Sequence, residues 1–138
     1  MTKEEITKEI IKLRKKVDSC TVNIHSYYKK IEALENNYNK SNLLISKYQS
    51  YLENYHSIIL HRINELDRDS DFSSFYRSRL NNIFNGRENY CILDSVSRGK
   101  RDLINQMNNY EEKITYENQK KLRYKQRIHE LEAKLKLI

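Results

Sequence analysis

The sequence predicts an all-α fold in the form of a long antiparallel helical hairpin, similar to a coiled coil. Three observations lead to this prediction. The 138 residues include no Pro and only two Gly, apolar residues recur at heptad spacing in both halves, and a polar segment separates the halves. Because Pro and Gly break helices and form turns, their scarcity excludes folds that need many strands and short loops. It also excludes a Gly-rich phosphate-binding loop.

The first half of the chain has the most regular pattern. One heptad position is apolar or aromatic nine times in succession, and the other is interrupted only by Ser41 and Arg62. Such a narrow stripe predicts a helix that packs against another helix. Thr2 and Glu5 form a capping-box pattern, so we expect this helix over about residues 3–66. Its seam, meaning the heptad positions that face the other helix, consists of Ile6, Ile10, Leu13, Val17, Cys20, Ile24, Tyr27, Ile31, Leu34, Tyr38, Ser41, Ile45, Tyr48, Leu52, Tyr55, Ile59, Arg62 and Leu66.

A polar segment, Asp67–Asp71, ends this pattern. Its short polar side chains compete with the backbone for hydrogen bonds and favour a turn over about residues 67–71. The apolar residues that follow predict a short helix over about 72–84. Asn85 and Gly86 then interrupt it, and Asn85 with Glu88 forms a second capping-box pattern. A helix therefore restarts at Gly86 or Arg87.

The last predicted helix spans about residues 87–137. It contains Gly99, which costs about 1 kcal/mol of local helix stability. Its seam mixes apolar and polar residues: Leu93, Val96, Lys100, Leu103, Met107, Tyr110, Ile114, Glu117, Lys121, Tyr124, Ile128, Leu131 and Leu135.

The two arms have nearly equal lengths, since Lys3 to Leu66 is 64 residues and Phe72 to Leu137 is 66. This match predicts one hairpin domain over residues 1–138 that reverses at Asp67–Asp71, with its returning arm interrupted near Asn85-Gly86. In the alternative, the main reversal lies at Asn85-Gly86, and residues 72–84 form a separate short helix.

The charge of the chain favours an acidic partner. Its net charge is +7, and residues 1–30 and 98–138 carry most of the excess, with eight basic against four acidic and eleven against six. Nucleic acid is not the favoured partner, because acidic residues are interspersed and no recognition motif is present. A single hairpin buries only one seam, so we expect a second helical pair, from another copy or another protein, to cover the remaining apolar side.

No arrangement of residues indicates an enzyme, a metal site or a cofactor. His56 and His61 are five residues apart and would diverge on a helix, and Cys20 and Cys91 would lie too far apart to form a disulfide. No nucleophile stands beside a base. The chain lacks a run of 18 apolar residues and an apolar leader, so we expect a cytoplasmic protein with no membrane span and no Sec signal.

One group of residues carries a family resemblance. Phe84 and Gly86 form an aromatic-x-Gly element at the predicted helix break, and Tyr90 and Asp94 lie one helical turn apart just after it. This pattern resembles the WXG-type helical hairpins of type VII secretion, in particular the small helical accessory proteins encoded beside LXG-domain toxins. Phe84 takes the Trp position of that element. Tyr90 and Asp94 correspond to the aromatic and acidic residues that contribute to export recognition in the family.

The resemblance implies a non-enzymatic targeting factor or chaperone. Its partners would be the helical N-terminal domain of an LXG-type toxin and a second small helical accessory protein. The protein would act in the cytoplasm or leave the cell with its partner by a type VII route. The alternative is a homodimeric coiled-coil adaptor with a structural role and no part in secretion.

Overall fold

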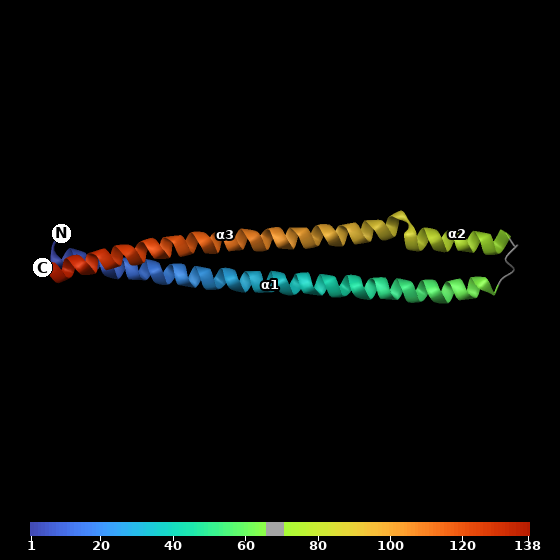
Figure 1. The fold of residues 1–138 in the computed structure, drawn as a ribbon, viewed down its shortest axis with the longest axis horizontal. Helices are drawn as coiled ribbons and strands as arrows, with labels where there is room; N and C mark the ends of the chain where they lie inside the picture. The colour runs from blue at the N-terminus through green and yellow to red at the C-terminus, as the bar shows by residue number, and fades with distance from the viewer. Residues whose placement is uncertain (66–70) are drawn as a thin grey trace. The chain divides into compact units, whose positions relative to one another are not determined.

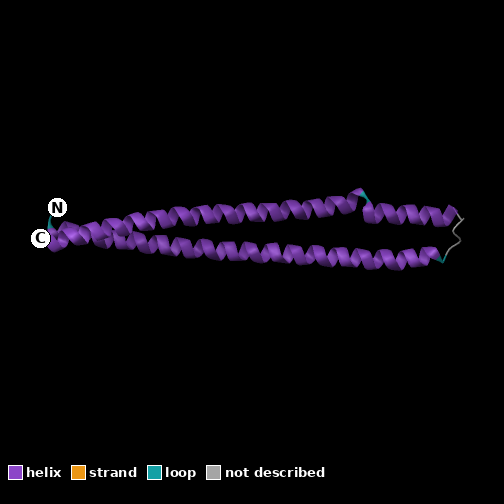
Figure 2. Cartoon of the chain, viewed as in Figure 1, coloured by secondary structure: helices purple, strands orange, loops and turns teal. Residues whose placement is uncertain are grey.

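The computed structural model describes the backbone of residues 1–65 and 71–138. Within these ranges it contains three α-helices and no strand: α1 spans Lys3–Asn64, α2 spans Asp71–Asn85 and α3 spans Arg87–Leu137 (Figure 2). The prediction of an all-α fold is confirmed. Asp71, which we assigned to the turn, is the first residue of α2. The rest of the predicted turn lies outside the described residues.

The capping box at the start of α1 forms as predicted. The backbone N–H of Glu5 donates a hydrogen bond to Oγ1 of Thr2 (3.2 Å), and the N–H of Thr2 donates to Oε2 of Glu5 (2.9 Å). These bonds satisfy two backbone donors that the first turn of a helix leaves without partners. The helix therefore begins at Lys3, and it ends at Asn64, two residues before the position expected from the heptad pattern.

The chain divides into two compact units, and the first comprises Met1–Glu35 and Ile104–Ile138. In unit 1 the start of α1 packs against the end of α3, and the two chain termini lie at the same end (Figure 1). Tyr27 of α1 stacks near Tyr110 of α3, with ring centroids 5.9 Å apart. The core of this unit consists of Ile6, Ile10, Leu13 and Leu131, with Tyr124, Ile128 and Leu135 packed against it.

The second unit comprises Asn36–Leu103 and contains the rest of α1, all of α2 and the start of α3. Arg77 of α2 donates a hydrogen bond to Asn64, and Tyr48 donates one to Asn89 of α3 (2.9 Å). From the first of these hydrogen bonds to the second, the residue number decreases along α1, from 64 to 48, and increases along the returning helices, from 77 to 89. Both α2 and α3 therefore run antiparallel to α1, and the chain does not reverse between them. The alternative with its main reversal at Asn85-Gly86 is wrong.

The seam of α1 departs from the predicted heptad after Leu52. Tyr55 and Arg62, both predicted seam residues, are exposed, whereas Ile63 is buried and His56 is half-buried. The physical reason is that an α-helix has 3.6 residues per turn, so a strict heptad line drifts by about 20° per heptad around a straight helix. The buried line therefore moves to the next residue along the chain, which explains why His56 is half-buried.

Candidate functional site

Gly86 forms the break between α2 and α3 on which the family resemblance rests. The N–H of Tyr90 donates to its carbonyl oxygen (3.2 Å), so Gly86 accepts the first hydrogen bond of α3. A Cβ at this position would overlap the carbonyl oxygen of Asn82, in the last turn of α2. Glycine is required here because the two backbone segments approach too closely for any side chain.

Tyr90 and Asp94 follow this break on α3. Tyr90 is 68% exposed, so most of its ring is open to solvent. Asp94 lies one turn later, and its carboxylate accepts a salt bridge from Arg98 (2.9 Å), an i,i+4 pair on the same helix. The predicted residues Gly86, Tyr90 and Asp94 thus occupy consecutive turns. Phe84 is the residue before the end of α2, and its side chain lies outside the described part of the structure.

A buried polar cluster in unit 1 is the feature that sequence reasoning missed. Glu117 of α3 is only 6% exposed and lies across from Cys20 of α1. Its Oε1 atom pairs with Nζ of Lys120 at 2.9 Å, while Oε2 is buried without a well-formed hydrogen bond. The sequence identified Cys20 and Glu117 as seam positions, and equal counting from the turn could have placed them opposite each other.

Electrostatics in this cluster favour a charged carboxylate and a neutral thiol. The hydrogen bond from Lys120 lowers the pKa of Glu117, against the effect of burial, and the same bond raises the pKa of Lys120. Burial, followed by the neighbouring Glu117, raises the pKa of the Cys20 thiol. Because only the thiolate is a good nucleophile, this cysteine is held in its unreactive form.

Acidification tests the role of Glu117. Its pKa is lowered in the folded state, so its stabilising effect is present above the ordinary value near 4.5 and is lost as the pH falls through the folded value. We expect Glu117→Gln to lower the free energy of unfolding at pH 7 by about 1 kcal/mol, and we expect the difference from the parent protein to shrink as the pH falls below about 4.5. Urea unfolding followed by circular dichroism measures this difference. Glu112→Gln, on the exposed side of the same helix, controls for the lost charge, and a difference in the free energy of unfolding that does not shrink on acidification would contradict the assignment.

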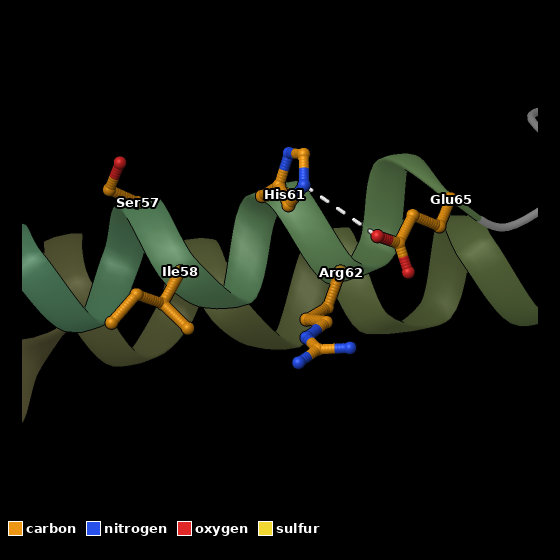
Figure 3. Close-up of a pocket in the computed structure, with 5 residues that line it drawn as sticks. All are labelled: Ser57, Ile58, His61, Arg62 and Glu65. Atoms are coloured by element: carbon orange, nitrogen blue, oxygen red, sulfur yellow. Dashed lines mark ion pairs between the residues drawn. The ribbon is translucent and has the colours of Figure 1, made fainter.

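A shallow pocket lies on the surface of α1 in unit 2, where Ser57, Ile58, His61, Arg62 and Glu65 line it (Figure 3). Nε2 of His61 is 3.6 Å from Oε1 of Glu65, and both side chains are exposed. Ser57, His61 and Glu65 follow each other at one-turn spacing, but no hydrogen bond joins Ser57 to His61. Because Ser57 makes no hydrogen bond to His61, these three residues do not form an activated nucleophile.

The most extensive candidate for a binding site is apolar. Many large apolar side chains remain uncovered in unit 2, where a two-helix arrangement cannot enclose them. Clusters of exposed apolar side chains commonly mark surfaces that bind other proteins. The exposed members of unit 2 are Leu43, Leu44, Tyr51, Tyr55, Ile58, Phe75, Tyr76, Ile83, Tyr90 and Ile92.

Other kinds of site find no support in the described parts of the chain. Over residues 1–65 and 71–138, no three His, Cys, Asp or Glu side chains are grouped so that they could hold a metal ion. None of the helices that the structure describes combines the length and the apolar character needed to cross a membrane. Comparison with protein-family models, with curated proteins and with solved structures finds no match.

Proposed function

We propose that this chain is a non-enzymatic helical binding protein that pairs with the helical N-terminal domain of an LXG-type toxin. In this role it acts as a targeting factor or chaperone for type VII secretion, together with a second small helical accessory protein. The observation that carries the proposal is the exposure of Tyr90 directly after the break at Gly86. An aromatic side chain that is 68% exposed next to a fixed helix break is suited to insertion between partner helices.

Two further features support a helical partner. Exposed apolar side chains of unit 2, such as Phe75 and Tyr90, would be removed from water by a packed helix, which is favourable by about 25 cal/mol per Å² of apolar surface. Unit 1 contains sixteen basic and eleven acidic residues, so an acidic helix would be drawn to it. Lys30 and Lys113 both lie over the ring of Tyr110, at 5.4 and 5.2 Å from its centroid, which concentrates positive charge there.

Co-expression with the N-terminal domain of a toxin encoded nearby tests the proposal. We expect the two proteins to co-purify, and Tyr90→Ala to weaken the complex at least about tenfold, because exposed aromatic anchors dominate interface energies. Titration by isothermal calorimetry measures the change. Tyr116→Ala, an exposed tyrosine of unit 1, is the matched control and should bind like the parent protein. A stable monomer that forms no complex with any such domain would overturn the proposal.

The competing function is a homodimeric coiled-coil adaptor without a role in secretion. The exposed apolar side chains of unit 2 favour it, because they could pack against the same side chains of a second copy. Light scattering separates the two functions: a tight homodimer that ignores an added toxin domain supports the adaptor, and a complex with that domain supports the proposed function.

A further inference from the structure

We propose that two copies of this chain pack together through one face of unit 2 in an antiparallel arrangement, with α1 against α1 and α2 against the start of α3 of the other copy. We call this surface the apolar face. The inference goes beyond the proposed function, because it concerns self-association. The apolar face consists of Leu44, Tyr51, Tyr55 and Ile58 of α1, Tyr76 and Ile83 of α2, and Ile92 of α3.

The α1 part of the apolar face is a regular stripe. Its four residues follow each other at steps of seven, four and three, so they share one side of the helix. Each is between 48% and 64% exposed. At 100° per residue this stripe lies about a quarter turn from the buried line through Leu52 and Ile63. It is therefore a second packing surface beside the first, and α2 and α3 do not cover it.

The α2 and α3 parts extend this surface. Tyr76 and Ile83 lie on one side of α2, beside the buried residue Leu80. Viewed along each helix from its N-terminus, this side of α2 is rotated away from Leu80 in the same direction as the α1 stripe is rotated away from the buried line of α1. In an antiparallel helix pair, rotation in the same direction brings both stripes to the same side of the pair. The Tyr48–Asn89 hydrogen bond sets the register and brings Ile92 level with Ile45, beside Leu44.

The charges at the ends of the face match a second, reversed copy. Lys40 and Lys47 lie toward its N-terminal end, and Glu65 lies toward its C-terminal end, on the same flank of α1. A two-fold axis between Tyr51 and Tyr55 puts Lys40 of each copy level with Glu65 of the other. A parallel pairing offers no such match. This complementarity is why we assign the face to a second copy, since an isologous contact needs a surface that complements itself.

The centre of the contact has the features of an interface core. The rings of Tyr51 and Tyr55 are 4.9 Å apart, and hydrogen bonding to Tyr55 raises the pKa of Tyr51. The axis brings two such tyrosine pairs together. Unit 2 holds ten basic and eight acidic residues, so two copies of it repel each other only weakly.

The size of the face is also sufficient. Lys40 and Glu65 are separated by about 38 Å along the helix, and two packed helices are about 20 Å wide. The face therefore offers roughly 760 Å² to a second copy, close to the roughly 800 Å² per partner of a standard stable interface.

Sedimentation equilibrium of the full chain tests the inference. We expect a dimer for the parent protein and at least about tenfold weaker dimerisation for Ile58→Glu, because the new charge would be buried. Leu43→Glu is the matched control: Leu43 is exposed on the same helix but outside the face, and its variant should dimerise like the parent. Circular dichroism checks that both variants stay helical. A parent protein that remains monomeric up to 100 µM would overturn the inference, as would equal weakening by both variants.

A charge exchange tests the antiparallel orientation without disturbing the apolar residues. Lys40→Glu and Glu65→Lys should each weaken the dimer, and the double variant should restore it. A dimer that the double variant does not restore would refute this arrangement. This test and the test of the proposed function fail separately. A parent protein that binds a toxin domain but does not dimerise overturns only the present inference. A parent protein that dimerises but binds no toxin domain overturns only the proposed function.

Discussion

Replacement of Leu131 by alanine is expected to lower the free energy of unfolding by about 3 kcal/mol. Leu131 is 0% exposed and packs in unit 1 against Ile6, Ile10 and Leu13 of α1. Truncation removes buried apolar surface and leaves a cavity that the surrounding side chains fill only in part. Because small proteins are stable by only about 5–15 kcal/mol, the loss is a large fraction of the total. Urea unfolding followed by circular dichroism at 222 nm measures it.

The control for this variant lies on the same helix. Leu122 is exposed, so Leu122→Ala should change the free energy of unfolding by no more than about 0.5 kcal/mol. The two substitutions remove the same atoms from the same helix in the same unit, and differ only in burial. Equal effects of the two variants would show that Leu131 does not lie in the core.

The elements specified by local signals were predicted well. The start of α1 depends on a contact between Thr2 and Glu5 within one helical turn, and the resulting hydrogen bonds have the predicted pattern. The end of α2 and start of α3 depend on Gly86, whose backbone contact with Asn82 is also local. Such signals are visible in sequence because their cause lies within four residues.

Features that depend on how distant segments meet were predicted less well. Tyr55 was predicted to lie in the seam and is exposed, because the sequence pattern does not reveal how far a helix supercoils. Equal counting from the turn places Cys20 opposite residues near 118, but it gives no reason to expect that Glu117 is buried beside that thiol. Lys120 completes that cluster from the next turn of α3, and the seam pattern alone gave no reason to include it.

The candidate recognition residues illustrate the same division. The positions of Gly86, Tyr90 and Asp94 on consecutive turns follow from spacing alone. The salt bridge between Asp94 and Arg98 also follows from i,i+4 spacing and could have been predicted. An uncovered apolar side was expected from the sequence, but the full apolar face was not, because Tyr55 was assigned to the seam and is recognisable as exposed only once the buried line through Leu52 and Ile63 is known.

The two glycines of the chain should respond in opposite ways to alanine substitution. At Gly86 a Cβ would overlap the backbone oxygen of Asn82, and backbone cannot yield as a flexible side chain can. We expect Gly86→Ala to lower the free energy of unfolding by about 2 kcal/mol. At Gly99, inside α3, a Cβ meets nothing within 4 Å. We expect Gly99→Ala to raise the free energy of unfolding by about 1 kcal/mol, since alanine has the higher helix propensity.

Each glycine variant is the control for the other, because the same methyl group is added to the same chain. Urea unfolding gives both free energies, and the opposite signs separate a steric effect at the break from a general effect of alanine. The break also has a local readout: the amide resonances of Tyr90 and its neighbours should shift in Gly86→Ala and stay in place in Gly99→Ala. If Gly86→Ala stabilised the protein as Gly99→Ala does, α2 and α3 would be able to join in one continuous helix. The glycine would then not be what separates them, and the turn that positions Tyr90 would have to be explained by other residues.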